Sequence, residues 1–432
     1  MEALIYAAGV IVFFLGVVIS IALHEVGHMV PAKRFGVKVT QYFVGFGKTL
    51  WSVKRGETEY GIKAIPLGGF VKLVGMLPPA KGEDPTKVRS SNTGMFTQLI
   101  ADARHAEYEH VQPGEEHRLF YRKPWWQKLI VMASGPLVNV AIAFILFTIV
   151  ISGFGVPQAT LTVDLVSECV IPASEKERAC TPDDPVAPAT DAGIRPGDEI
   201  VSFNGTEVTE WEQLTQLIRN NSDGAAEIVV ERDGESLTLT TNTQVSSREV
   251  LDDPEAFEEV GFLGVVPTQV VKREGLATVG SSMWRYTEAT GEAILHLPER
   301  MVEVAEAAFG GERKQNSPIS VVGASRVAGE LVSYDEVSWS ERIASLISLL
   351  AAVNLFVALF NFIPLLPLDG GHIVGAIWEA VRRGIARLRG RPDPGFVDVG
   401  KLLPVAYVVG ALLMIMGVLL VYADIVNPIQ LQ

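Results

Sequence analysis

The stretch LIYAAGVIVFFLGVVISIALHEVGH, residues 4–28, decides the class of this protein. Its apolar part is long enough to cross a bilayer as a helix, because about 20 residues span a hydrocarbon core of about 30 Å. A cleaved signal peptide is the alternative, but the only charged residue ahead of the stretch is acidic, Glu2, and no small-x-small cleavage motif follows it. Three more stretches pass the length test, which gives four predicted spans: 3–23, 129–151, 343–363 and 403–422.

Composition and charge suggest how these spans are oriented. Among 432 residues, 48% are apolar and 50 are acidic, and the mean hydropathy is +0.27, so apolar and acidic residues must occupy different segments. Residues 31–128 carry 16 Lys and Arg against 9 Asp and Glu, and residues 372–402 carry 6 against 3, which predicts a cytoplasmic location for both. Residues 154–341 carry 13 basic and 34 acidic residues, and we expect this segment and both termini outside the cytoplasm. The expected surroundings are a lipid bilayer, and no nucleic acid is expected as a partner.

The two cysteines, Cys169 and Cys180, both lie in the predicted external segment. A disulfide between them would close a loop of about 12 residues and would contribute about 3 kcal/mol in an oxidising compartment. Two unpaired thiols are the alternative, and the sequence alone does not decide between them.

Residues 58–76, after the first span, alternate in polarity and are rich in Ile, Val, Phe and Gly. This pattern predicts a β-hairpin that turns at Gly68 and Gly69. Its apolar character places it against the membrane, where non-helical backbone is tolerated only beside protein or a water-filled cavity. Residues 77–126 form a polar cytoplasmic insertion. It contains three histidines, for which a solvated loop is a simpler account than metal binding: His105, His110 and His117.

The external segment 154–274 has the strand, helix and turn signals of an inserted α+β domain, centred on the run DAGIRPGDEIVSFNG, residues 191–205. Residues 275–315 have the pattern of amphipathic helices, which we expect on the outer membrane surface. The elements predicted in the domain are a helix end at Gly193, a turn at 196–198, a strand at 199–203, a helix at 209–220, a hairpin turn through Arg232, Asp233 and Gly234, and a strand from Gly261 to Pro267.

The motif HEVGH at the inner end of the first span carries the chemistry. Two imidazoles four residues apart, His24 and His28, lie on one face of a helix and can share a zinc ion, and Glu25 is then close enough to act on a metal-activated water. Polar residues at a helix end that extend toward the interface are the alternative, but two His and a Glu at this depth are costly without a function.

A catalytic zinc site needs a third protein ligand, and Asp369 is the best candidate. It lies in NFIPLLPLDGG, residues 361–371, where Pro364 and Pro367 should end the third span. We expect Gly370 and Gly371 to free the backbone, so that the carboxylate turns inward. The third span and the first both run toward the cytoplasm, so the two motifs arrive at similar depth.

With GPLVN at residues 135–139 of the second span, these motifs resemble the bacterial site-2 proteases, and most closely the regulator-of-sigma-E protease group in a form with one PDZ domain where others carry two. The AGIRPGD run resembles a circularly permuted bacterial PDZ domain, and a structural domain without a ligand is the alternative. SPISVVG at residues 317–323 also matches the site-2 proteases, and residues 60–75 match their membrane-reentrant β-hairpin. The resemblance further implies that Asn361 binds the substrate backbone and that the PDZ carboxylate loop is Gly261, Phe262, Leu263 and Gly264.

The expected function is therefore zinc-dependent intramembrane proteolysis, with Zn²⁺ as cofactor and Glu25 as general base. The substrate would pair with the hairpin at Gly68, Gly69, Phe70 and Val71. The resemblance implies single-span substrates of the anti-sigma-factor kind, cut after a first extracytoplasmic cleavage in the bacterial cytoplasmic membrane.

Two other classes of function are weaker fits to the sequence. A non-enzymatic PDZ scaffold with a structural metal site does not explain the intact Glu25, and a metal transporter would need polar residues in several spans, whereas residues 403–422 carry no charge. The predicted segments are 1–57, first span and loop; 58–76, hairpin; 77–126, insertion; 127–153, second span; 154–274, PDZ domain; 275–341, amphipathic segment; 342–371, third span; 372–402, cytoplasmic loop; and 403–432, fourth span and tail.

Overall fold

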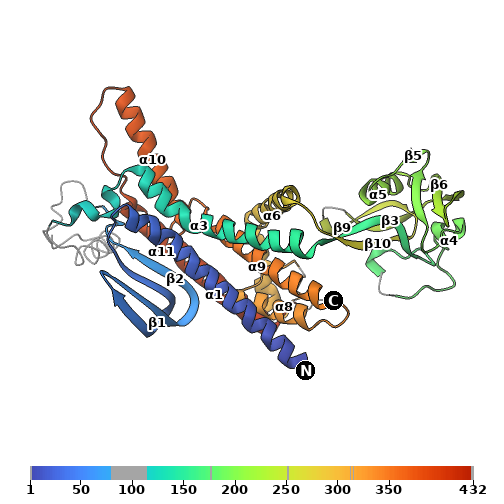
Figure 1. Cartoon of the computed structure of the whole chain (residues 1–432), viewed down its shortest axis with the longest axis horizontal. Helices are drawn as coiled ribbons and strands as arrows, with labels where there is room; N and C mark the ends of the chain where they lie inside the picture. The colour runs from blue at the N-terminus through green and yellow to red at the C-terminus, as the bar shows by residue number, and fades with distance from the viewer. Residues whose placement is uncertain are drawn as a thin grey trace. The chain divides into compact units, whose positions relative to one another are not determined.

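The computed structural model describes residues 2–78, 114–175, 178–250, 253–311, 313–314 and 316–429. The chain forms two compact units, one of Met1–Phe154 with Glu274–Gln432 and one of Gly155–Arg273 (Figure 1). The second unit begins and ends within one residue of the external domain predicted at 154–274. Most of the insertion, including His105 and His110, lies outside the described residues.

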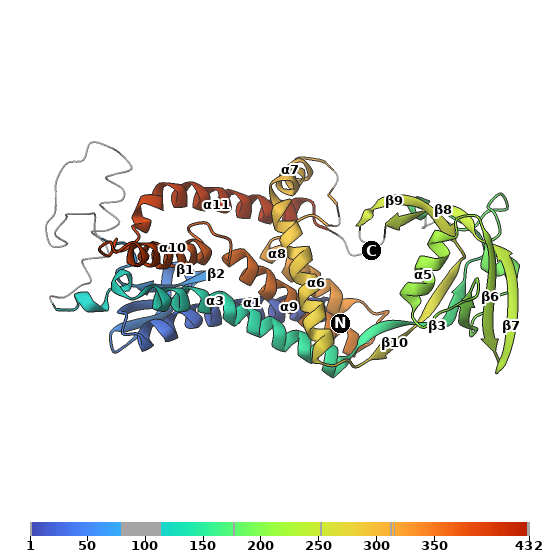
Figure 2. The ribbon, with the colours of Figure 1, turned by 90° about the horizontal axis from the view of Figure 1, so that it is seen from above.

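Four helices of the first unit are long and apolar enough to cross a membrane. They are α1 (Glu2–Arg34), α3 (Trp125–Thr148, continued by a π-helical turn at Ile149–Phe154), α9 (Trp339–Asn361) and α11 (Leu403–Val426). The helices α1, α3 and α9 pack together, while α11 contacts mainly α7 and α8 (Figure 2). On α11, large apolar side chains such as Leu412, Met414 and Val418 are exposed, as expected for a helix surrounded by lipid. The prediction of a multi-pass membrane protein with an inserted β-containing domain is confirmed.

Three shorter helices follow the second unit in the chain: α6 (Leu276–Leu295), α7 (Leu297–Ala308) and α8 (Val321–Ser333). The helices expected in 275–315 are therefore present. The helix α8 packs on the N-terminal half of α1 at two glycines, Gly9 and Gly329, where a Cβ on Gly9 would lie 3.1 Å from the Cα of Gly329. Short 3-10 turns occur at Glu116–Arg118, Phe120–Arg122, Ala173–Glu175 and Val399–Leu402.

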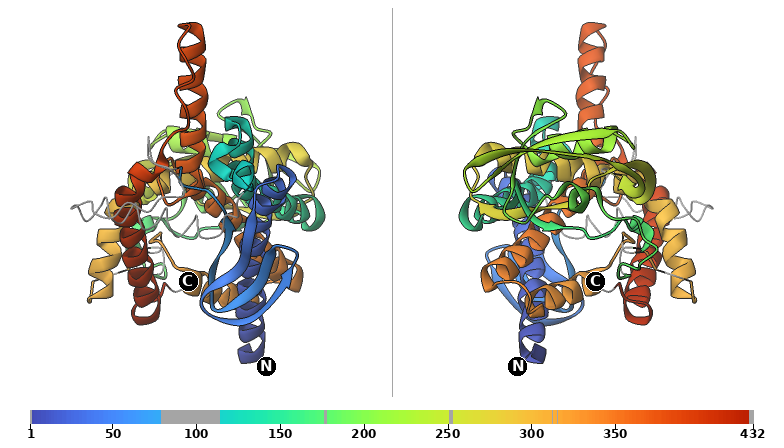
Figure 3. Two further views of the ribbon diagram at one scale, coloured as in Figure 1. Left: turned by 90° about the vertical axis from the view of Figure 1, so that its left-hand side faces the viewer. Right: turned by 90° about the vertical axis from the view of Figure 1, so that its right-hand side faces the viewer.

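The segment 372–402, predicted as a cytoplasmic loop between two spans, contains a helix that the sequence analysis did not predict, because Asp369–Leu388 forms α10. It packs on α3 and projects beyond the other helices of its unit (Figure 3). The predicted role of Gly370 and Gly371 is wrong. A Cβ on Gly370 would lie 2.1 Å from the Ile363 carbonyl oxygen, and one on Gly371 2.7 Å from the Leu366 nitrogen. These glycines let the start of α10 pack against the preceding turn, which is a requirement for space and not for flexibility.

The β-hairpin is longer than predicted and turns elsewhere. Its strands are β1 (Val39–Arg55) and β2 (Thr58–Leu73), joined at Gly56, whose φ is +62°. The predicted turn at Gly68 and Gly69 is wrong, because residues 39–55 also form a strand and the hairpin closes at the shorter connection between the two. Both strands bend, so that Val44 pairs with Ile62 on one side and with Gly69 on the other. The segment 69–73 therefore pairs with β1 residues along one side.

The second unit is a sheet with strand order β10-β3-β4-β6-β7, in which β5 pairs with β4, and a separate β8–β9 hairpin. Its core contains Ile200, Phe203, Leu214, Ile228 and Leu263. The elements are β3 (Val156–Val166), α4 (Pro188–Ala192), β4 (Glu199–Phe203), β5 (Thr206–Glu207), α5 (Trp211–Asn220), β6 (Ala225–Arg232), β7 (Glu235–Asn242), β8 (Gln244–Val250), β9 (Asp253–Phe262) and β10 (Val265–Lys272).

Most of the local predictions in this unit are confirmed: the helix end at Gly193, the strand at 199–203, the helix near 209–220 and the turn at Asp233 and Gly234. The predicted strand from Gly261 to Pro267 is wrong. It is divided between β9 and β10, because Gly264 takes a φ of +92° and Leu263 turns into the core.

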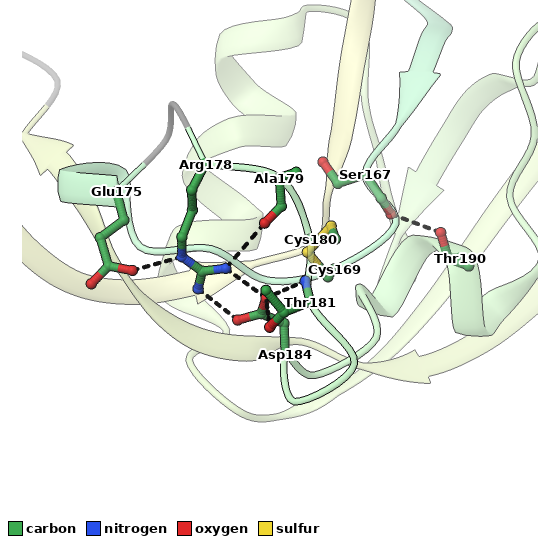
Figure 4. Close-up of a disulfide and its surroundings, with 9 residues drawn as sticks. All are labelled: Ser167, Cys169, Glu175, Arg178, Ala179, Cys180, Thr181, Asp184 and Thr190. Atoms are coloured by element: carbon green, nitrogen blue, oxygen red, sulfur yellow. Dashed lines mark hydrogen bonds and ion pairs between the residues drawn. A yellow bond between two sulfur atoms is a disulfide. The ribbon is translucent and has the colours of Figure 1, made fainter.

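Cys169 and Cys180 form a disulfide. The loop that it closes is further held by Arg178, which donates to Glu175 and to both carboxylate oxygens of Asp184 (Figure 4). Thr181 donates to the same Asp184 carboxylate. Of the two alternatives, a disulfide or two unpaired thiols, the structure contains the disulfide.

Asp198, the last residue of the AGIRPGD run, ties the start of β4 to the end of the neighbouring strand β6. Its buried carboxylate accepts hydrogen bonds from the backbone N–H of Arg195 and from Nε and Nη2 of Arg232 on β6. The hydrogen bond from Arg232 is the main cause that lowers the pKa of Asp198. Such a carboxylate stabilises the fold above its unfolded pKa of about 3.9, and the stabilisation is lost as the pH falls through the lower folded value.

We expect Arg232→Met to destabilise the second unit at pH 7 by about 3 kcal/mol, because it leaves Asp198, which is 1% exposed, charged and unpaired. The deficit should shrink as the pH falls below about 4. Calorimetric unfolding of the purified protein at several pH values measures this. Arg195→Met is the matched control, since the hydrogen bond from Arg195 to Asp198 comes from its backbone. A deficit that is independent of pH would contradict the ion-pair account.

Candidate metal centre and active site

The HEVGH motif lies within α1, on the face that is buried against α3. His24 and His28 are 8% and 5% exposed, and their Nε2 atoms are 3.2 Å apart. The neighbouring helix can come this close because Gly135 has no side chain: a Cβ there would lie 2.1 Å from His28 Nε2. Gly27 plays the same part on α1, where a Cβ would lie 2.7 Å from the Ser134 carbonyl oxygen.

Asp369 completes a group of three. It is the first residue of α10, and its Oδ2 lies 3.3 Å from Nε2 of each histidine. The turn between α9 and α10 brings it there, since α9 ends at Asn361, before the two prolines. Within the described part of the chain, these three residues are the group that could hold a metal ion, with ligand atoms within 4.8 Å of one another.

Groups on α3 hold the Nδ1 atom of each imidazole ring, on the side away from the other two ligands. His28 Nδ1 lies 2.8 Å from the Val131 carbonyl oxygen, and His24 Nδ1 lies 3.2 Å from Asn139 Oδ1. A carbonyl oxygen can only accept, so each Nδ1 carries the proton and each Nε2 keeps its lone pair. In the sequence, Asn139 stands out only as the last residue of GPLVN. The signal that points to it is an amide in an apolar span, which needs a partner there.

The group fits a zinc ion. Two lone pairs and a carboxylate oxygen face one another with no proton between them, and Asp369 Oδ2 is buried without a hydrogen-bond donor among the described residues. Ligands at about 2.0–2.1 Å from a tetrahedral zinc are roughly 3.3 Å apart, which matches the observed separations. A cation of this size would relieve the repulsion among the three atoms.

Glu25 lies on α1 where the hairpin crosses it. A Cβ on Gly69 would be 3.0 Å from Glu25 Cγ and 3.2 Å from Ile21 Cγ2, so the absent side chain lets β2 run directly against the helix. Tyr42 of β1 fixes the crossing by donating its hydroxyl hydrogen to the Ala22 carbonyl, at 2.9 Å. The structure thus brings the strand that contains Gly68, Gly69, Phe70 and Val71 to the glutamate.

Two other sets of predicted site residues belong to other elements. Asn361 ends α9, and its amide donates to the Val357 carbonyl within the same helix. Gly261, Phe262, Leu263 and Gly264 lie in the second unit, where they connect β9 to β10.

Comparison with known proteins gives a match to peptidase family M50 over residues 12–392. The chain belongs to this family. It is 35% identical to the zinc metalloprotease Rip1 of Mycobacterium tuberculosis over 441 residues, covering 99% of this chain and 100% of the relative. It is 34% identical to the Rip1 of Mycolicibacterium smegmatis over 99% of this chain and 100% of that one. The metalloprotease MmpA of Caulobacter vibrioides is 25% identical over 86% of each chain.

The M50 match confirms the predicted family, the site-2 proteases, and with it a zinc metalloendopeptidase that performs regulated intramembrane proteolysis. Zinc is accordingly the cofactor that the sequence predicted.

A buried ion pair, missed in the sequence, holds the Asp369 helix of this M50 peptidase. Lys128 at the start of α3 lies 2.6 Å from Glu379 of α10, whose side chain is 2% exposed. Arg383 also contacts Glu379, and the Phe396 ring covers both cations. A buried pair is costly to break on one side. The pair therefore fixes α10 along α3, which also positions both histidines.

We expect Asp369→Asn to bind zinc more than about tenfold more weakly while still inserting into the membrane, because a neutral amide is a poor ligand. Asn139→Leu should weaken zinc binding about 10–100-fold, since it removes a group that orients His24 and not a ligand. Zinc retained per mole against a series of chelator concentrations measures both variants. Wild-type affinity in Asp369→Asn would remove Asp369 from the ligand set.

Proposed function

We propose that this M50 peptidase cuts single-span membrane proteins of the anti-sigma-factor kind in the bacterial cytoplasmic membrane, after a first cut outside it. The observation that carries the proposal is the group His24, His28 and Asp369, with Glu25 on the same helix as the histidines, enclosed by candidate membrane spans. A soluble protein has no need to enclose such a group in apolar helices. A membrane scaffold has no need for a glutamate beside it.

Each residue has a role that follows from its place. His24, His28 and Asp369 would hold the zinc ion, which when bound supplies a Lewis acid for the scissile carbonyl and lowers the pKa of water toward about 7. Glu25 takes the proton from the attacking water and returns it to the leaving amine. Asn139 and the Val131 carbonyl hold both imidazoles in the tautomer that leaves Nε2 free.

The substrate has to be extended where it is cut, because the peptide bonds of a helix are shielded by their own hydrogen bonds. The segment 69–73 of β2 pairs with β1 along one side and passes Glu25 at Gly69. We propose that the substrate adds to this segment as a further strand, held by backbone hydrogen bonds. Asn361, at the end of α9, would hold the substrate backbone from the other side.

The second unit is proposed to be a PDZ domain outside the cytoplasm that filters substrates. The external segment 154–341, in which it lies, carries 13 basic and 34 acidic residues, a net charge of about −21. The domain would exclude substrates with a bulky outer portion and admit those already shortened. A second version of the filter is that a new carboxyl terminus docks at Gly261–Gly264.

Glu25→Gln should keep its zinc and lose cleavage by more than about 100-fold, because it removes the base without removing a ligand. Cleavage of a model single-span protein in proteoliposomes measures the loss, and membrane proteomes of cells with either form would identify the spans that accumulate. Glu2→Gln, at the far end of the same helix, is the matched control. Residual activity within tenfold of wild type would contradict the assignment of the base.

Gly69→Val should reduce cleavage by more than tenfold at unchanged zinc content, because the added side chain would occupy the space between β2 and Glu25. Ala64→Val adds bulk to an exposed position of the same strand and should have little effect. Undiminished cleavage in Gly69→Val would show that substrate does not use this segment of the strand.

Deleting residues 160–270 tests the filter. The deletion is practical because Ala159 pairs with Gln269 and Pro157 with Val271, so a short Gly-Ser linker can join the ends. If the domain excludes bulky substrates, the deletion protein should cut an untrimmed substrate that the wild type rejects. If docking of a carboxyl terminus is obligatory, the deletion protein should cut neither the untrimmed nor the trimmed substrate. An unchanged ratio of long to short substrate cleavage, in a zinc-loaded deletion protein, would refute both versions.

A further inference from the structure

One side of the helix α10 is apolar and exposed along most of its length. Six large apolar residues on it are between 42% and 89% exposed: Val374, Ile377, Trp378, Val381, Ile385 and Leu388. Their spacing, i, i+3, i+4, i+7, i+11 and i+14, places them on a single face of the helix, which we call the apolar stripe. A continuous exposed apolar surface of this kind marks contact with a partner or with lipid.

The opposite side of α10 is buried against the rest of its unit. Ala376, Glu379 and Ala386 lie on that side, and each is at most 9% exposed. Glu379 forms the ion pair with Lys128 of α3. These contacts fix the rotation of the helix about its axis, so that the apolar stripe points away from α3.

The start of α3 indicates how deep in the membrane α10 lies. The helix begins at Asp369, one of the three candidate zinc ligands, and ten residues later Glu379 is level with Lys128. Next to Lys128 are Trp125 and Trp126, which are 37% and 44% exposed. Indole rings gather at the boundary between hydrocarbon and headgroups. The first half of the apolar stripe is therefore at the depth of the hydrocarbon.

The second half of α10 continues through the headgroup layer. Its last residue is nine positions beyond Glu379, which is about 13 Å along the helix, whereas the headgroup layer is roughly 5–8 Å thick on each side. The end of α10 accordingly lies beyond the other helices of its unit (Figure 3). The apolar stripe reaches that end, where a helix in water would carry polar residues on all sides.

Three cations stand at this end of the helix. Arg387, Arg389 and Arg391 are exposed, and among the described residues no acid pairs with them. The nearby acids Glu379 and Asp393 are both paired with Arg383. The end of α10 therefore combines an apolar stripe with unpaired positive charge.

An anionic lipid surface suits both features. The acyl chains would cover the apolar stripe, which continues the lipid-facing surface of the spans, and the headgroup phosphates lie at the level of the arginines. A second copy of the chain suits them less well. Two copies in one membrane have the same orientation, so contact between their stripes would bring both sets of three arginines together.

We propose that the apolar stripe of α10 enters the leaflet at the Trp125 end of α3, and that Arg387, Arg389 and Arg391 bind the headgroups of anionic phospholipids there. Since α10 begins at Asp369, the lipid binds the same helix that carries a candidate zinc ligand. This lipid site is separate from the cleavage proposed above, and it is measured without a substrate.

The test measures which lipid lies beside the end of the apolar stripe. The full-length protein carries Leu388→Cys labelled with the fluorophore NBD, and the two native cysteines stay unlabelled because they form a disulfide. It is placed in phosphatidylcholine nanodiscs that contain a small fraction of doxyl-labelled lipid, either phosphatidylglycerol or phosphatidylcholine. Both lipids should quench the NBD, and phosphatidylglycerol should quench it at least about twofold more strongly. Salt at about 1 M should remove this preference, because it screens the charges.

Replacing the three arginines tests their role. Arg387→Gln, Arg389→Gln and Arg391→Gln combined should keep the quenching by phosphatidylcholine and lose the preference for phosphatidylglycerol. The matched control removes three exposed cations of the hairpin and should keep the preference: Lys48→Gln, Lys54→Gln and Arg55→Gln combined. Unchanged zinc content and elution volume show that a variant is folded.

Three results would overturn the proposal. Equal quenching by the two lipids, in the labelled protein that keeps all three arginines, rejects the binding of anionic headgroups. Absence of quenching by either lipid rejects the insertion of the apolar stripe, and a disulfide between two copies of unlabelled Leu388→Cys would then identify a second copy as its cover. A full preference in the folded variant without the three arginines rejects their assignment.

Discussion

The close approach of α1 and α3 is the constraint on which the metal centre depends. Two glycines permit it, Gly27 on one helix and Gly135 on the other, and a methyl group at either position would meet backbone or imidazole atoms within 2.7 Å. At that distance the backbone carbonyl of Val131 and the amide of Asn139 reach the outer nitrogens of the two histidines. In lipid there is no water to take their place, so the helix contact itself sets the tautomers.

The third ligand reaches the same place by a different route. Asp369 begins a helix that folds back after α9, and α10 is fixed against α3 by the buried pair of Lys128 and Glu379. The helix that orients the histidines thus also anchors the helix of the carboxylate. The two histidines and Asp369 come from distant parts of the chain, and they meet because α3 positions both α1 and α10.

The hairpin also packs closely on α1 because of a glycine. Gly69 brings a strand against the side of α1 that bears Glu25, and Tyr42 secures the crossing. The second unit has a core of its own.

The sequence by itself determined the elements whose signal is local. Long apolar runs predicted the spans, the i, i+4 spacing predicted that His24 and His28 share a face, and glycines predicted the helix end at Gly193 and the turn at Gly234. It also proposed Asp369, because prolines and topology placed that acid at the right depth. Tertiary structure decided what depends on distant partners. Gly68 and Gly69 carry a turn composition, yet they lie in a strand because residues 39–55 pair with it and pack it on α1. Gly370 and Gly371 open a helix because the turn before them leaves no room for side chains. Lys128 and Glu379 have no local signature, and Asn139 is marked only as an amide in an apolar span. The partners of all three are contributed by other helices and meet them only when the chain is folded.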